Sequence, residues 1–248
     1  MHRIRSLPFC LSHHKTRGQN LLIGFVAMVK SSRLLTAAFT VHSSFSDLIS
    51  KYDGFILDQY GVLHNGRQPL PGAVDCVKKL VEQNKKLVIL SNTSSVSSSA
   101  LNKIRKIGFD PEWFNAGAVT SGEEASRYIQ KRFGSGPSES PKKAIWLTYS
   151  KGPLTPPPEE FLGRCGNIEL AESVDEADFI IGHGAEIWLQ PNDEEVSIGS
   201  FMQDGSFNVL GPLLAECRER AIPFVCANPD FIVKVPSGTA YMPGEWNQ

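Results

Sequence analysis

Two short apolar runs, each followed by an amphipathic helix pattern, constrain the fold more than any other feature of the sequence. Residues 54–58 (GFILD) and 86–90 (KLVIL) have the nearly continuous apolar character of strands buried in a parallel sheet. Residues 71–84 and 97–108 carry apolar residues at helical spacing, and Gly108 is placed to end the second helix. The order strand, helix, strand, helix predicts an α/β fold with a parallel sheet.

Polar residues stand where each of these predicted strands ends. Asp58 closes the first strand and Ser91 follows the second. Functional loops of parallel α/β sheets lie at the carboxyl ends of the strands. If the two strands are neighbours, Asp58 and Ser91 face a common crevice, which is the predicted ligand site. A short helix is also predicted just before the first strand, in residues 44–53.

Beyond about Pro111 the pattern changes to shorter elements separated by long polar loops, which predicts a domain boundary near residues 109–115. The second region is predicted to be another α/β unit. Its predicted helices are residues 121–133 and 211–222, and its predicted strands are residues 143–149, 177–184 and 223–230.

The N-terminal 45 residues are predicted to be a leader. Residues 1–46 contain basic residues and many Ser and Thr residues but no Asp or Glu, which is typical of a mitochondrial or chloroplast transit peptide. The alternative is a cytoplasmic protein whose disordered tail carries no address, and Met28 opens a second plausible start. The apolar run at residues 20–28 is far shorter than the ~20 residues of a membrane span, so no membrane partner is predicted.

Charge and cysteine usage narrow the classes of partner. With six of the 25 basic residues in the leader, 19 basic and 26 acidic residues remain downstream, a formal net charge of -7. Such a body repels a nucleic-acid backbone, so no nucleic-acid partner is predicted. The five cysteines are widely separated and form no C-x-x-C pair, which favours a reducing compartment and thiols without a metal role.

The string DGFILDQYGVLHNGRQPLPGA at residues 53–73 resembles motif I of haloacid dehalogenase-type (HAD) hydrolases. The string LVILSNTSS at residues 87–95 resembles their motif II. The resemblance is to class IIA, in which a large α/β cap follows the second motif; this class includes phosphatases of p-nitrophenyl phosphate, pyridoxal phosphate and nucleotides. Further landmarks of that cap are matched at residues 120–125, 180–184 and 226–233.

The resemblance covers roughly residues 46–244 and implies a fold. It implies a Rossmann-like HAD core with an inserted α/β cap of the C2 type. The N-terminal part of the core corresponds to residues 46–110, the cap to residues 111–235, and a truncated return to the core to residues 236–248.

The resemblance also implies roles for four residues. Asp58 matches the carboxylate that attacks phosphorus and forms an aspartyl-phosphate. The Asp58 carboxylate and the backbone carbonyl of Tyr60 match ligands of Mg²⁺. Ser91, with Asn92 beside it, matches the position that holds phosphoryl oxygens, aided if the following helix points its N-terminus at them. A small phosphorylated metabolite is the substrate class implied.

Two departures from the family pattern limit the expected activity. Tyr60 replaces the usual second Asp, which protonates the leaving group, and a phenol is a weaker acid than a carboxylic acid. The family's later G-K-P and G-D-x-x-x-T-D segments do not occur in the 248 residues. Lys142, Lys143, Lys151 and Asp230 are interpreted as surface or turn residues rather than substitutes.

The expectation is therefore a phosphatase-type chain with weak or no activity. The alternative is a non-catalytic binding module or a truncated isoform. Neither the substrate nor the oligomeric state follows from the sequence.

Overall fold

The computed structural model of the chain describes residues 42, 44–134, 136, 139–151, 158–235 and 238–247. The predicted leader lies outside the described residues, apart from a few positions at its end. Among the helices within these ranges, none is both long enough and apolar enough to cross a membrane.

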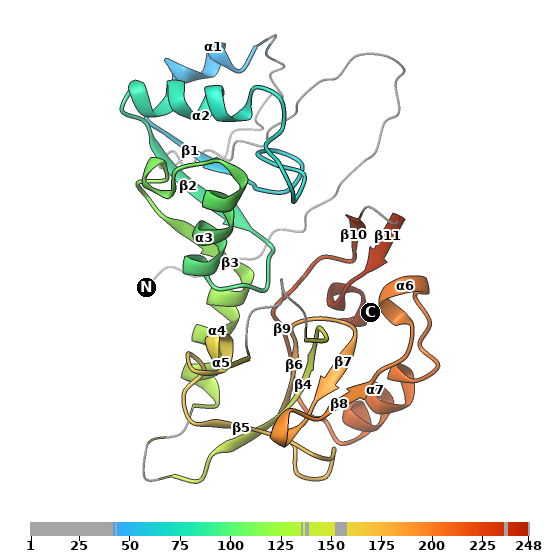
Figure 1. Cartoon of the computed structure of the whole chain (residues 1–248). Helices are drawn as coiled ribbons and strands as arrows, with labels where there is room; N and C mark the ends of the chain where they lie inside the picture. The colour runs from blue at the N-terminus through green and yellow to red at the C-terminus, as the bar shows by residue number, and fades with distance from the viewer. Residues whose placement is uncertain are drawn as a thin grey trace, which may run out of the picture.

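The N-terminal elements form a three-stranded parallel sheet with the strand order β1-β2-β3 (Figure 1). The strands are β1 (Gly54–Leu57), β2 (Lys86–Ser91) and β3 (Ala118–Thr120). The helices are α1 (Ser46–Ile49), α2 (Ala73–Glu82) and α3 (Ser97–Ile107), followed by the 3-10 helix η1 (Pro111–Trp113). The predicted order strand, helix, strand, helix is confirmed.

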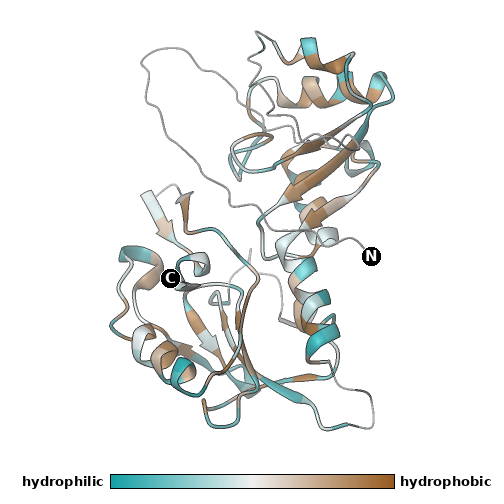
Figure 2. Ribbon diagram, turned by 180° about the vertical axis from the view of Figure 1, so that it is seen from behind, coloured by the Kyte–Doolittle hydropathy of each residue, from teal (hydrophilic) through white to brown (hydrophobic). Residues whose placement is uncertain are grey.

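The buried side chains of this sheet share one core with the helices. Phe55 and Leu57 of β1 and Leu87 and Ile89 of β2 are buried with residues of α2 and α3. Because the strands follow in chain order and right-handed crossovers connect them, both helices cover the same face. The other face is less covered: Leu90 is 51% exposed and Val119 is 40% exposed, and the two are register partners. Figure 2 shows the apolar character of these strands.

A second sheet of six strands follows, with the order β8-β7-β4-β6-β9 and with β5 paired to β4. The pairs β4–β5, β4–β6 and β6–β9 are parallel, whereas β7 pairs antiparallel with both β4 and β8. Its strands are β4 (Lys142–Thr148), β5 (Ile168–Leu170), β6 (Phe179–Gly182), β7 (Ile187–Leu189), β8 (Glu195–Ser197) and β9 (Phe224–Cys226).

Helices cover both faces of the second sheet. Alternate residues of its strands therefore belong to two different hydrophobic cores. Trp146 and Ile181 pack with α4 (Ser121–Arg132) and α5 (Pro158–Leu162). Ile145 and Ile180 pack with α6 (Phe201–Asp204) and α7 (Leu210–Glu219). The remaining 3-10 helix is η2 (Pro191–Asp193).

After β9 the chain forms an antiparallel hairpin of β10 (Ile232–Val235) and β11 (Gly238–Tyr241), followed by the 3-10 helix η3 (Pro243–Asn247). The segment between β9 and β10 leads from the second sheet past the loop that follows β2 (Figure 1). The division of the chain at residues 111 and 235 stays a prediction. The first sheet includes β3, which lies after residue 111.

Candidate functional site

Asp58 and Ser91 lie at the carboxyl ends of adjacent parallel strands. Asp58 directly follows β1, Ser91 is the last residue of β2, and the two strands pair in parallel. Both residues line one cavity of about 460 Å³, which confirms the predicted common crevice. Tyr60 and Asn92 line it as well. The other residues of its lining are Gln59, His64, Thr93, Ser95, Ala100, Lys103, Asn228, Asp230, Ile232 and Val233.

The Asp58 carboxylate is partly withdrawn from solvent at the cavity wall. Its Oδ1 atom accepts a hydrogen bond of 2.7 Å from the backbone N–H of Gln59. Desolvation raises the pKa of Asp58 above 3.8, and the negative charge of Asp230 raises it further, while the Gln59 hydrogen bond acts in the opposite direction. A cation or a hydrogen-bond donor bound in the cavity would therefore find an electrostatically unsatisfied carboxylate.

The loop after β1 is held by a buried His64. The backbone N–H of Gly66 donates to Nδ1 of His64 at 3.0 Å, so the proton of the neutral ring is on Nε2, which lies 3.5 Å from Oε1 of Gln59. Burial lowers the pKa of His64 to about 4, aided by the positive charge of Lys103, so the ring is neutral at neutral pH. Gly61 and Gly66 have φ values of 81° and 91°, which suit glycine in this tight loop.

Tyr60 stands on the wall of the cavity with 49% of its surface exposed. Its ring packs edge-on against His64, with 6.3 Å between the ring centroids. The structure thus places Tyr60 beside Asp58, where the resemblance expects it. Its catalytic role and the metal-binding role of its carbonyl stay predictions.

The loop after β2 turns its polar atoms toward the cavity. Ser91 Oγ accepts from the backbone N–H of Thr93 at 3.3 Å, and Thr93 Oγ1 accepts from Ser95 N–H at 3.3 Å. The first N–H of α3, that of Ser97, donates to Oε2 of Glu123 at 3.2 Å. The predicted aid from the N-terminus of this helix is therefore not available at Ser97, because the Glu123 carboxylate takes that donor.

Two charged residues of the cavity were not recognised from the sequence. Asp230 was interpreted as a surface turn residue, yet its Oδ1 accepts a 2.8 Å hydrogen bond from Asn92. Gly244 N–H donates to the carbonyl of Asp230 at 3.0 Å and fixes the backbone there. The second charged residue is Lys103, which lies on α3 and also lines the cavity. Ala100 and Lys103 are three residues apart and therefore lie on the same face of α3. This spacing could have indicated Lys103 only if Ala100 were already known to line the cavity.

The lysines considered from the sequence lie elsewhere, as interpreted. Lys142 pairs with Asp178 at 2.8 Å, Lys143 pairs with Glu176, and Lys151 pairs with Asp193 at 2.9 Å. These pairs are on the second sheet and its loops.

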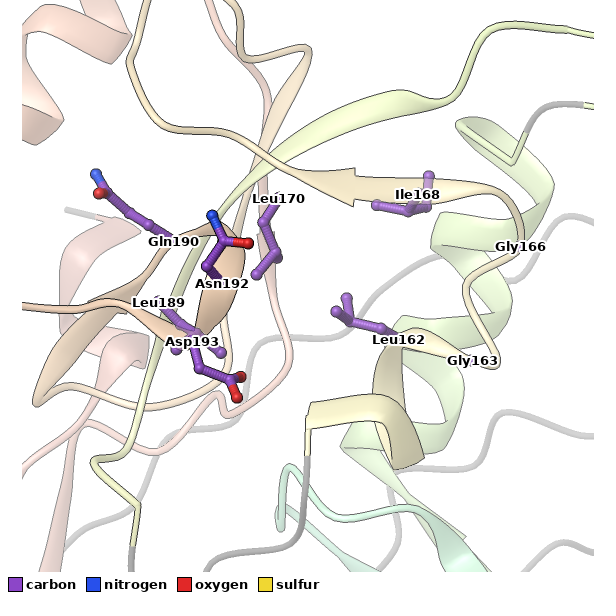
Figure 3. Close-up of a pocket in the computed structure, with 9 residues that line it drawn as sticks. All are labelled: Leu162, Gly163, Gly166, Ile168, Leu170, Leu189, Gln190, Asn192 and Asp193. Atoms are coloured by element: carbon purple, nitrogen blue, oxygen red, sulfur yellow. The ribbon is translucent and has the colours of Figure 1, made fainter.

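Another hollow of about 330 Å³ lies beside β5 and β7 (Figure 3). Leu162 and Ile168 face Leu170 and Asn192 across it, and Asp193 stands at its rim. Most of its lining consists of leucine, isoleucine and glycine residues, and Asp193 is already paired with Lys151. The cavity between Asp58 and Asp230 is therefore the better candidate, because several polar groups converge on it.

Part of the chain is similar in sequence to known hydrolases. Residues 55–154 match the family model of haloacid dehalogenase-like hydrolases. A 4-nitrophenylphosphatase from Schizosaccharomyces pombe is 37% identical over 65 residues, which is 26% of this chain and 22% of that protein.

Solved structures share the fold. A haloacid dehalogenase-like hydrolase from Brucella suis 1330 is similar with a TM-score of 0.62 at 20% identity, covering 84% of this chain and 65% of that one. A possible sugar phosphatase from Cytophaga hutchinsonii is similar with a TM-score of 0.57 at 19% identity, covering 82% and 64%. The chain thus spans less than two thirds of each of these relatives. Residues 55–154 are therefore similar to the haloacid dehalogenase-like hydrolases, and the chain has an α/β fold of the Rossmann-like kind.

Proposed function

We propose that the cavity binds a small phosphate monoester and hydrolyses it slowly, with Asp58 as the nucleophile. The observation that carries the proposal is the placement of Asp58 and Ser91 at the ends of adjacent strands, facing one cavity that also contains Lys103. A carboxylate, a hydroxyl and a cation around one space suit an ester dianion whose phosphorus must be reached by an oxygen nucleophile.

The reaction follows from these groups. An oxygen of Asp58 attacks phosphorus, the bond from phosphorus to the ester oxygen breaks, and the leaving oxygen takes a proton. Water then attacks the aspartyl-phosphate, which releases phosphate and restores Asp58. Ser91 and Asn92 hold the oxygens that do not react, and Lys103 offsets their negative charge. Tyr60, which also lines the cavity, is proposed to donate the proton to the leaving oxygen, and because a phenol is a weak acid this step is slow.

Mg²⁺ is the proposed cofactor. Across the described residues, no group of three or more His, Cys, Asp and Glu side chains is placed to hold a metal. Asp58 and Asp230 nevertheless line one cavity with hydroxyl and amide oxygens, and Mg²⁺ is commonly held by one or two carboxylates together with substrate phosphate and water. The donor set fits. The ion would neutralise the charge that makes a phosphate dianion and Asp58 repel each other.

We further propose that the region of the second sheet acts as the cap over the site. Asn228 and Asp230, which follow β9, line the cavity together with residues of the first sheet. This arrangement would limit the size of the alcohol part of the substrate.

The test is hydrolysis of p-nitrophenyl phosphate by the purified chain in Mg²⁺. We expect slow release of nitrophenol that is abolished in Asp58→Asn and kept in Asp53→Asn, a matched change at an exposed position before β1. Equal release by the wild type and Asp58→Asn would exclude the proposed chemistry.

A non-catalytic phosphate-binding module is the second candidate, favoured by Tyr60 at the acid position. It predicts saturable binding of inorganic phosphate, weakened by Lys103→Met, without any release of nitrophenol.

A further inference from the structure

Ser94, in the loop between β2 and α3, is the meeting point of buried polar contacts from the second sheet. His183, directly after β6, is buried, and its Nδ1 lies 2.9 Å from Oγ1 of Thr148 at the end of β4. The imidazole also hydrogen-bonds to the backbone of Ser94. The Tyr149 hydroxyl is hydrogen-bonded to the Ser94 side chain and accepts from Nδ2 of Asn228 at 3.1 Å.

The protonation state of His183 determines which ring nitrogen donates a hydrogen bond and which accepts one. Burial lowers the pKa of His183 to about 4, so the ring is neutral at neutral pH and has one donor and one acceptor nitrogen. A ring nitrogen that bonds to a backbone carbonyl must donate, so Nε2 donates to Ser94 and Nδ1 accepts the Thr148 hydroxyl proton. The rings of Trp146, Tyr149 and Phe161 surround the imidazole at 5.6, 6.0 and 5.2 Å between centroids, which fixes its plane.

Ser94 is also held from the side of β3 and α4. Gly122 N–H donates to the carbonyl of Thr93 at 3.0 Å, and a Cβ atom at Gly122 would lie 1.8 Å from the carbonyl oxygen of Ser94. The backbone of the loop therefore rests directly on Gly122. Ser94 is therefore contacted both by this segment and by His183 and Tyr149, which follow strands of the second sheet.

These contacts connect His183 and Tyr149 to two loops that line the cavity. Ser94 stands between Ser91, Asn92 and Thr93 on one side and Ser95 on the other, all of which line the cavity. Asn228 donates to the Tyr149 hydroxyl, and Asp230, two residues later, accepts from the Asn92 amide. The loop at residues 91–95 and the loop at residues 228–230 are thus joined through one network of polar contacts.

We infer that His183 is a positioning residue, which holds the Ser94 carbonyl so that residues 91–95 keep the shape required to bind a phosphate group. The inference rests on the proposed function for its ligand, but the coupling of the loop to His183 can be measured without any ligand. His183 touches neither the substrate nor the reacting atoms; it acts through Ser94.

The experiment compares His183→Asn with His183→Gln. The Gln amide reaches about as far as Nε2 and can still donate to Ser94, whereas the shorter Asn amide lies near the position of Nδ1 and cannot. Hydrogen–deuterium exchange of peptides covering residues 91–97 reports local opening of the loop. We expect exchange to rise at least about 10-fold in His183→Asn, and clearly less in His183→Gln, since losing a buried hydrogen bond has an effect of this order.

Ile181→Val is the control, because Ile181 is buried two residues earlier, in β6, and belongs to the apolar core. It should lower the melting temperature without raising exchange at residues 91–97. If His183→Asn does not fold, Thr148→Val replaces it, since it removes the hydroxyl that orients Nδ1. Unchanged exchange at residues 91–97 in the folded variant, or an equal rise in Ile181→Val, would overturn the inference.

Binding of inorganic phosphate in Mg²⁺, measured by calorimetry, completes the test. We expect about 10-fold weaker binding in His183→Asn and partial rescue in His183→Gln. Failure of the wild type to bind phosphate would count against the proposed function, while the exchange measurement would still decide the role of His183.

Discussion

Asn92 and Asp230 are 138 residues apart in the chain, yet the Asn92 amide donates a 2.8 Å hydrogen bond to the Asp230 carboxylate. The bond joins the loop after β2 to the segment after β9 at the wall of the cavity. It also determines where a second negative charge lies relative to Asp58. The ionisation of Asp58 therefore depends on a residue from a distant part of the sequence.

Asp230→Asn should lower the pKa of Asp58. The Asp230 charge is one cause of the raised pKa, and an Asn side chain at this position can still accept the hydrogen bond from Asn92. Titration of the Asp58 carboxyl carbon by NMR measures the shift. Asp193→Asn, at a carboxylate paired with Lys151 outside the cavity, should leave the Asp58 titration unchanged. An upward shift in Asp230→Asn would contradict this electrostatic account.

Asp58→Asn should raise the melting temperature at neutral pH in the presence of a metal chelator. The pKa of Asp58 is raised in the folded state, so its favourable contribution to stability is fully present below 3.8 and is lost as the pH rises through the folded-state pKa. The amide removes this loss. The two proteins should have similar thermal stability in acid below that window and diverge above it, as measured by calorimetry across pH. A lower melting temperature at neutral pH would show that the carboxylate is stabilising.

Lys103→Met should weaken the binding of inorganic phosphate about 10-fold, because a charged donor to the phosphate oxygens is lost while the apolar stem is kept. The loss should shrink at high salt, which screens an exposed charge. Lys106→Met is the matched control: Lys106 is exposed on the same helix and is not part of the cavity lining. Calorimetric titration of both variants measures the difference, and equal affinities would remove Lys103 from the site.

Gly122→Ala should destabilise the chain by about 3 kcal/mol or more, because the added methyl group would overlap the Ser94 carbonyl at 1.8 Å and the backbone must move. Gly136→Ala is the control, since nothing lies within 4 Å of a Cβ atom there. Urea unfolding followed by circular dichroism compares the two. A small effect in Gly122→Ala would mean that the loop at residues 91–95 can shift freely.

Much of the first sheet could be predicted because its signals are local. The apolar runs of β1 and β2 and the helical spacing in α2 and α3 predict these elements, and the strand-end rule then predicts that Asp58 and Ser91 meet. The short strands β5, β7 and β8 were not predicted. They have three residues each, and sequences such as IEL and EVS lack a clear period.

The rest of the site depends on packing between distant segments, which no local pattern encodes. Asp230 reaches the cavity because the backbone near Gly244 supports its loop and Asn92 bonds to it. Lys103 reaches it because α3 and the end of β2 line the same cavity. The neutral state of His64 and His183 likewise follows from burial, which becomes evident only in the folded chain.

The hydrogen bond between Asn92 and Asp230 also bears on the order in which the protein folds. Contacts between residues far apart in the chain close large loops, so they form more slowly than the local contacts of helices and neighbouring strands. The cavity wall is complete only when the segment after β9 has reached the loop after β2. The binding site should therefore mature last, after both sheets have acquired their secondary structure.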